Sequence, residues 1–156
     1  MSAVVNQPDP VFRPADVTDL DAIMSIELRV YPFPWTKRIF ADCIRVGYSC
    51  EVVQVGQEIA GYAIMSMGAN EAHLLNICIA PEWQSQGIGR ELLEHILTIA
   101  EQHEVDTVFL EVRPSNRHAV ALYEKMGFNV IGTRKDYYPA KNGREDAIIF
   151  ARAIIR

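Results

Sequence analysis

One stretch limits the fold of this chain more than any other, because it must form a strand, a turn and a helix in succession. It runs from Asn76 to Glu91 and reads Asn-Ile-Cys-Ile-Ala-Pro-Glu-Trp-Gln-Ser-Gln-Gly-Ile-Gly-Arg-Glu. The apolar beginning predicts a strand, Pro81 interrupts it, and Gly87 and Gly89 predict a turn that leads into a helix. The first N–H groups of a helix have no intrahelical partner, and the helix dipole is positive there. The turn is therefore a candidate site for an anion such as a pyrophosphate, and an ordinary flexible turn is the alternative.

Two segments of the chain resemble a known family. The spacing Gln84-x-x-Gly87-x-Gly89 after a strand resembles the acetyl-CoA signature of the GCN5-related N-acetyltransferase superfamily. The sequence has neither the third glycine of a dinucleotide fingerprint nor the Gly-Lys-Ser/Thr of a nucleotide P-loop. The second segment, farther along the chain, is Asn116-x-x-Ala119-x-x-x-Tyr123-x-x-x-Gly127-Phe128. Because the two segments occur in the order typical of the superfamily, with one predicted strand between them, the resemblance is specific.

Size and composition are those of a single globular domain. The chain has 156 residues, of which 49% are hydrophobic and 22% are charged. We expect residues 1–10 to form a flexible N-terminal tail and residues 11–156 to form one N-acetyltransferase domain. The formal net charge of −5 argues against direct nucleic-acid binding and suits a basic peptide substrate.

The cysteines and the hydropathy pattern indicate a compartment. Cys43, Cys50 and Cys78 are odd in number and lack metal-ligand spacing, so we expect free thiols in a reducing environment and no bound metal. We see neither a secretory signal nor an apolar run long enough to span a membrane. The expected location is therefore the cytoplasm, with no membrane partner.

The order of the predicted elements is β-α-α-β-β-β-α-β-α-β-β. This order predicts an α/β (α+β) fold, with a mixed central sheet of about seven strands flanked by about four helices. The predicted strands lie near residues 11–13, 50–55, 58–67, 71–80, 107–113, 129–138 and 146–154. The predicted helices lie near residues 19–30, 37–46, 88–103 and 117–126.

Local signals set several of these boundaries. We expect Thr18 to cap the first helix, with Asp21 completing a capping box. Thr36 and Asn116 are expected to cap the second and fourth helices. Gly127 is expected to end the fourth helix in the left-handed conformation, and residues 141–144 to form the last turn.

The resemblance implies where acetyl-CoA binds. It implies that the backbone of Ile77, Cys78 and Ile79 pairs with the pantetheine amides, and that Asn116 contacts the same arm while capping its helix. Arg90 adds charge at the turn, or is simply exposed. Cys78 is expected to pack as a small hydrophobic residue, with self-acylation as the alternative. The pyrophosphate would be held at the turn by Gln84 and by the segment Gln86, Gly87, Ile88, Gly89 and Arg90.

Two residues are candidates for the catalytic proton transfers. Glu111 lies in an apolar strand, where a carboxylate is unfavourable unless it is paired or faces a wet cleft. The resemblance implies that it is the general base, and an ion pair with Arg113 is the alternative. Tyr123 lies on the apolar face of its helix, and the resemblance implies that it is the general acid near the CoA sulfur. A phenol with a pKa of about 10 stays protonated at neutral pH, and simple buried packing is the alternative.

Aromatic residues beside turns are candidates for contact with the acceptor. The segment 31–35 forms either a wall of the acceptor groove, through Phe33 and Trp35, or a hydrophobic plug between two helices. Tyr137 and Tyr138 lie beside another turn. Four segments resemble the ribosomal-protein-alanine N-acetyltransferases within the superfamily: Phe33-Pro34-Trp35, Leu110-Glu111-Val112-Arg113, Asp136-Tyr137-Tyr138-Pro139 and Gly143-Arg144-Glu145-Asp146-Ala147.

Together these resemblances imply an acetyl-CoA-dependent Nα-acetyltransferase. The implied acceptor is the N-terminal alanine of small-subunit ribosomal protein eighteen, with direct transfer in a ternary complex. One alternative is an N-acetyltransferase for another protein N-terminus or a small amine. A non-catalytic acyl-CoA-binding module is the second alternative, and the presence of both Glu111 and Tyr123 argues against it. The sequence does not determine the oligomeric state, although a monomer is favoured.

Overall fold

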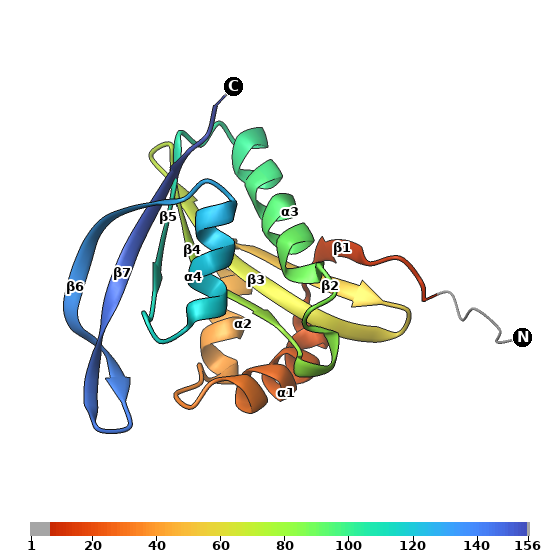
Figure 1. Cartoon of the computed structure of the whole chain (residues 1–156). Coiled ribbons are helices and arrows are strands. Elements are labelled where there is room, and N and C mark those ends of the chain that lie inside the picture. Colours follow the sequence, from red (N-terminus) through yellow and green to blue (C-terminus); the bar gives the residue numbers. More distant parts are fainter. Residues whose placement is uncertain (1–6, 156) are drawn as a thin grey trace, which may run out of the picture. The chain divides into compact units, whose positions relative to one another are not determined.

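The computed structural model describes residues 7–155 (Figure 1). Within them the chain forms seven strands, four α-helices and two short 3₁₀ helices. The strands are β1 (Val11–Pro14), β2 (Ser49–Val55), β3 (Glu58–Gly68), β4 (Glu71–Ile79), β5 (Thr107–Val112), β6 (Asn129–Ala140) and β7 (Gly143–Ala153). The helices are η1 (Val17–Asp19), α1 (Leu20–Val30), α2 (Lys37–Arg45), η2 (Pro81–Trp83), α3 (Ile88–Gln102) and α4 (Arg117–Lys125).

The strands pair in the order β1-β2-β3-β4-β5-β7-β6. β4 and β5 are parallel, with Glu71 opposite Thr107, whereas β5 with β7, β6 with β7, and β1 with β2 are antiparallel. The long strands β6 and β7 run side by side as a hairpin, drawn in blue in Figure 1. The expected mixed sheet of seven strands with four helices is confirmed.

The fold contains two compact units. Among the described residues, the first unit comprises residues 7–64 and 76–95, and the second comprises residues 65–75 and 96–155. The expectation of a single domain over residues 11–156 stays a prediction. The tail expected for residues 1–10 falls mostly outside the described residues, and residues 7–10 form neither helix nor strand.

The core of the first unit forms where the apolar stripe of α1 meets α2 and the strands. Leu20, Ile23 and Ile26 are buried on that stripe, as its helical period predicts. They pack with Phe40 of α2 and Tyr62 of β3, whose rings lie edge to face with centroids 5.6 Å apart. This cluster holds α1 and α2 in place beside the strands that precede the glycine turn.

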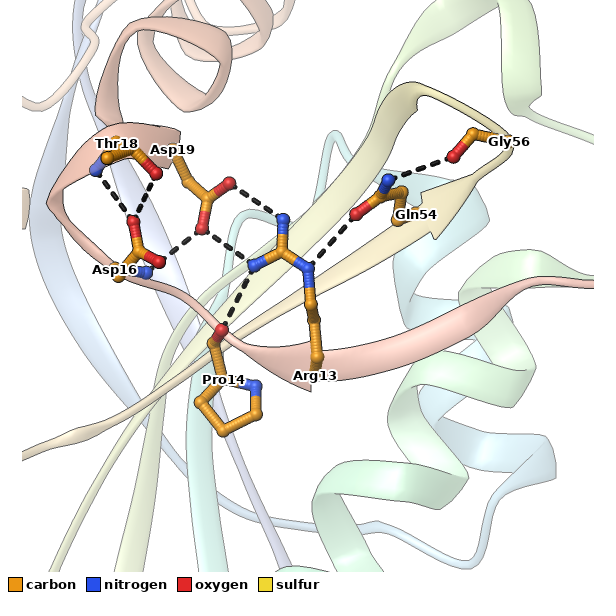
Figure 2. Close-up of polar contacts among 7 residues, drawn as sticks. All are labelled: Arg13, Pro14, Asp16, Thr18, Asp19, Gln54 and Gly56. Carbon is orange, nitrogen blue, oxygen red and sulfur yellow. Dashed lines mark hydrogen bonds and ion pairs between the residues drawn. The ribbon is translucent and has the colours of Figure 1, made fainter.

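The start of the first helical segment differs from the prediction. The cap is Asp16, whose side chain accepts hydrogen bonds from the backbone N–H and the hydroxyl of Thr18. The capping box is completed by Asp19, so the predicted pair of Thr18 and Asp21 is wrong. Arg13 explains the shift, because its guanidinium binds both carboxylate oxygens of Asp19 at 2.8 and 2.9 Å (Figure 2). This pairing draws η1 toward β1.

The same arginine links β1 to β2. Its Nε donates to Oε1 of Gln54 at 3.0 Å, as Figure 2 shows. The hydrogen bond from Arg13 also holds the pKa of Asp19 below its ordinary value. Asp19 is buried, and its pairing with Arg13 offsets the cost of removing its charge from water.

The other predicted boundaries are confirmed, with one adjustment. Thr36 caps α2 and Asn116 caps α4, and Gly127 follows α4 with a φ of +88°. The final hairpin is longer than expected, because Ala140 still pairs with Gly143 and the turn is confined to residues 141–142. A register shift between Arg134 and Tyr138 lets β6 continue that far.

Gly61 of β3 marks a close approach of two strands. A Cβ at this position would lie 2.5 Å from the carbonyl oxygen of Cys78 and 2.6 Å from Cδ1 of Ile79. We expect Gly61→Ala to destabilise the fold by about 1–3 kcal/mol, because β4 must move away. The measurement is the free energy of unfolding in urea. Gly68→Ala is the control, since a Cβ there meets nothing within 4 Å. Equal midpoints for both variants would contradict this close packing.

Candidate active site

The glycine turn connects the end of β4 to the start of α3 within the first unit. Ser85 and Gly87 have φ values of +63° and +83°, in the left-handed region. A Cβ on Gly87 would meet nothing within 4 Å, so the backbone conformation, not crowding within the protein, requires glycine there. Ile88 is buried and the N–H of Glu91 bonds the carbonyl of Gly87 at 3.1 Å. The amides of residues 88–90 therefore precede the first full helical bond and are suited to bind an anion.

The polar side chains of the turn mainly hold its shape. Nε2 of Gln84 donates to the carbonyl oxygen of Ile79 at 3.0 Å, which ties the turn to the end of β4. Gln86 donates to the carbonyl oxygen of Glu82 at 3.3 Å. Arg90 is exposed and pairs with Glu94 at 3.2 Å. This agrees with the alternative that Arg90 is simply an exposed residue. Gly89 lies in the first turn of α3.

Two backbone carbonyl groups of the strand segment expected to bind pantetheine already accept hydrogen bonds from side chains. The hydroxyl of Tyr31 donates to the carbonyl oxygen of Ile77 at 3.0 Å, in addition to the bond from Gln84 to Ile79. Between them Cys78 is buried, and burial raises the pKa of its thiol to about 11. Its environment therefore favours packing over self-acylation, because the thiolate is the reactive form.

The aromatic segment after α1 is divided between packing and exposure. Tyr31 and Trp35 pack against the core of the first unit, with the Trp35 ring 5.1 Å from that of Phe40. Phe33 lies between them and is 47% exposed. The plug interpretation therefore describes Tyr31 and Trp35, whereas the Phe33 side chain is exposed.

Glu111, the candidate base, lies on β5 in the second unit, and its cationic partner is Arg134 instead of Arg113. Its Oε1 accepts a hydrogen bond from Nε of Arg134 at 2.9 Å. Arg113, the partner considered from the sequence, pairs with Glu145 at 3.3 Å and donates to the carbonyl of Pro139 at 2.7 Å. The Glu111 side chain is 20% exposed, so solvent still reaches it.

Tyr137 and Tyr138 belong to the same cluster in the second unit. Their ring centroids lie 4.8 Å apart. The guanidinium carbon of Arg134 lies 5.6 Å from the Tyr137 ring centroid, and that of Arg113 lies 4.4 Å from the Tyr138 ring centroid. A hydrogen bond to Glu111 raises the pKa of Tyr137, and burial raises that of Tyr138 to about 12. Both phenols therefore remain protonated donors at neutral pH. The hydrogen bond between Tyr137 and Glu111 places these candidate acceptor residues close to the candidate base, at the register shift of β6.

Tyr123, the candidate acid, is buried on α4 in the second unit. Its ring lies 5.8 Å from that of Phe128 and 6.1 Å from that of Phe150. Asn116 caps the same helix, because its Oδ1 accepts the N–H of Ala119 at 3.3 Å. These contacts hold the tyrosine ring in one place, and its role as an acid stays a prediction.

One buried polar residue of the first unit was missed from the sequence. Glu27 lies on α1 and is 1% exposed. It accepts hydrogen bonds from the hydroxyl of Tyr62 at 2.5 Å, from the side chain of Asn76 at 3.0 Å and from the backbone N–H of Trp35 at 2.8 Å. A signal for it does exist, because Glu27 follows Ile23 by four positions and so falls in the apolar stripe of its helix.

Two further features concern the described residues as a whole. Within residues 7–155, no three His, Cys, Asp or Glu side chains are grouped so that they could hold a metal ion. No helix in this part of the chain has the length and apolar character needed to cross a membrane.

Comparison with known proteins gives consistent matches. The model of the Acetyltransferase (GNAT) family matches residues 20–128. A [ribosomal protein bS18]-alanine N-acetyltransferase of Escherichia coli K12 is 45% identical over 140 residues, which cover 89% of this chain and 94% of the relative. A putative enzyme of the same description from Bacillus subtilis is 34% identical, covering 84% and 87%. The crystal structure of the ribosomal-protein-S18-alanine N-acetyltransferase from E. coli superposes with a TM-score of 0.89 at 41% identity, covering 95% and 96%.

Proposed function

The chain belongs to the Acetyltransferase (GNAT) family, and we propose that it transfers the acetyl group of acetyl-CoA to the N-terminal alanine of ribosomal protein bS18. The observation that supports this most is the 45% identity to the E. coli bS18-alanine enzyme, which extends over 89% of the chain. A ribosomal acceptor would place the enzyme in the cytoplasm.

We assign the cofactor contacts to the first unit. The backbone amides of residues 86–90 would bind the pyrophosphate, where Gly87 holds the required backbone conformation. The strand Ile77–Ile79 would bind the pantetheine arm, since the carbonyl oxygens of Ile77 and Ile79 can each accept a second hydrogen bond beside those from Tyr31 and Gln84. The contact of Asn116, which belongs to the second unit, with the pantetheine arm stays a prediction from the resemblance.

We assign the proton transfers to the second unit. The neutral α-amine attacks the acetyl carbonyl, a C–N bond forms, and the C–S bond breaks. The proton lost by the amine passes to Glu111, directly or through water. The CoA thiolate receives a proton from Tyr123. Arg134 lies 2.9 Å from Glu111 and keeps that carboxylate oriented before the acceptor arrives.

The chemistry of the acceptor agrees with a terminal amine. An α-amino group has a pKa of about 7.7–8.0 and a lysine side chain a pKa of about 10.4. Near neutral pH the fraction of α-amine that is neutral is therefore about two orders of magnitude greater than the neutral fraction of a lysine side chain. A carboxylate base that already accepts hydrogen bonds from Arg134 and Tyr137 suffices for the α-amine.

Peptide acetylation rates test this assignment. We expect a basic peptide that begins with alanine to be acetylated at least about tenfold faster than the same peptide beginning with leucine, because an acceptor site specific for terminal alanine would have no space for the larger side chain. An Nα-blocked version containing lysine should react about a hundredfold more slowly at pH 7.5. The measurement is kcat/KM for the three peptides with saturating acetyl-CoA.

The three rates also separate the alternatives. Equal kcat/KM values would exclude specificity for terminal alanine and indicate an acetyltransferase of broad acceptor range. Absence of turnover with every amine, despite acetyl-CoA binding, would indicate an acyl-CoA-binding protein instead.

A further inference from the structure

Glu27 is a buried carboxylate of the first unit with an unusual set of partners. Asp19, for comparison, is paired with the cation of Arg13, and Glu51 hydrogen-bonds the ring of His95 at 2.6 Å, which is a cation only when protonated. The three groups that hydrogen-bond Glu27 are a phenol, a side-chain amide and a backbone N–H, all of them neutral. A buried carboxylate without a cation is unfavourable relative to an apolar residue of similar size. The contacts that Glu27 makes therefore call for a role beyond stability.

The contact with the Trp35 backbone identifies what Glu27 holds. Residues 31–36 lie between α1 and α2 and belong to neither a helix nor a strand. The strands that carry Tyr62 and Asn76 are held by their own backbone ladders. The segment that depends most on Glu27 is therefore the one that contains Trp35.

A second bond fixes the other end of this segment. The hydroxyl of Tyr31 donates to the carbonyl of Ile77, the neighbour of Asn76 on β4. Both ends of the segment are thus linked to β4 by hydrogen bonds. Tyr31 bonds β4 directly, and Trp35 is linked to Asn76 of β4 through the carboxylate of Glu27. Phe33 lies between Tyr31 and Trp35 in the sequence, and its side chain is exposed.

We propose that Glu27 is a positioning residue that anchors the segment 31–35 and so presents Phe33 to the acceptor peptide in a fixed conformation. A surface loop that is already ordered loses less conformational entropy when a ligand binds. The contact of Phe33 with the acceptor rests on the proposed function, whereas the anchoring of the segment does not.

Three variants test the anchor. Glu27→Leu removes both acceptors, and it should raise the KM for the alanine-initiated peptide about tenfold, with kcat and the acetyl-CoA Kd changed less than about threefold. Glu27→Gln keeps an oxygen for the Trp35 N–H, and its amide group can face Tyr62 and Asn76 if their polar groups reorient. Its KM should stay within about threefold of the wild-type value. Asp19→Leu is the control, because it removes a buried carboxylate of the same unit whose hydrogen bonds come from Arg13 and the backbone of Asp16.

Hydrogen exchange gives a readout that needs no substrate. The amide of Trp35 should be protected in the wild type and in Glu27→Gln, and should exchange at least about tenfold faster in Glu27→Leu. In Asp19→Leu its protection relative to the rest of the unit should be unchanged. If the wild type acetylates none of the peptides, the proposed function fails while the exchange rates still test the anchor.

The outcomes that would overturn the proposal are specific. Normal peptide KM and normal Trp35 protection in Glu27→Leu would exclude an anchoring role. Equal damage in Glu27→Gln and Glu27→Leu would indicate that the charge matters and not the hydrogen bond to Trp35. Should Glu27→Leu fail to fold, Glu27→Asp replaces it, because a side chain one methylene shorter cannot span to the Trp35 N–H. It should raise KM and expose that amide in the same way, and wild-type values in this variant would also exclude the anchor.

Discussion

Glu111→Gln should lower kcat for the alanine-initiated peptide by about 10²–10⁴-fold near neutral pH, the usual range for loss of a general base. The loss should be largest below the pKa of the α-amine, where the substrate is mostly protonated and must give up a proton. It should shrink as the pH rises toward about 9, where the amine is mostly neutral without help. The measurement is the pH dependence of kcat with saturating acetyl-CoA.

Tyr123→Phe should give a different profile for the same reaction. Removal of a general acid should lower kcat at all pH values in that range, because the thiolate needs its proton whatever the state of the amine. The acetyl-CoA Kd should change little, since the ring and its packing against Phe128 and Phe150 are retained.

Glu145→Gln is the matched control for Glu111→Gln. Glu145 lies in the same unit, its side chain is 22% exposed against 20% for Glu111, and it also pairs with an arginine. Its hydrogen bonds with Ser115 and Arg113 hold its pKa below the ordinary value. If loss of any carboxylate in this cluster disturbed the site, both variants would be affected alike. Losses below about threefold in both Glu111→Gln and Tyr123→Phe would move the catalytic roles to other residues.

Gly87→Asp should weaken acetyl-CoA binding by about a hundredfold or more, the second large effect we expect. Asp tolerates the left-handed conformation that Gly87 adopts at φ +83°, and no protein atom lies within 4 Å of the new Cβ. The fold should therefore persist, while a carboxylate at the start of α3 repels the pyrophosphate and competes for its amide donors. Calorimetric titration with acetyl-CoA measures the Kd.

Two controls isolate the charge at the turn. Gly87→Asn has nearly the same size and backbone tolerance without the charge, so it should weaken binding less than Gly87→Asp. Gly47→Asp places the same residue at φ +87° in equally open space between α2 and β2, and it should leave the Kd unchanged. A normal Kd in folded Gly87→Asp would refute the assignment of the turn as the phosphate site.

The features that the sequence predicted well are those that depend on neighbouring residues. The strand, turn and helix around Gly87, the caps at Thr36 and Asn116, and the left-handed Gly127 all follow from backbone sterics and from hydrogen bonds within one helical turn. The resemblance predicts catalytic roles for Glu111 and Tyr123. The cap at Thr18 was wrong, because Arg13, on a different element, binds Asp19 and moves the start of the helical segment.

Tertiary structure alone decided the partners of the buried and half-buried polar groups. Glu111 meets Arg134, which is 23 positions away, and Glu27 meets Tyr62 and Asn76, which are 35 and 49 positions away. A periodic pattern in the sequence reports which face of a helix is buried, and it therefore assigns Glu27 to the core without naming a partner. The partner depends on which strands lie beside that face, and on bulges such as the one in β6 that redirect side chains. The sequence by itself thus determined the elements and the turn, whereas the pairing of strands decided which charges and hydrogen-bonding groups face one another.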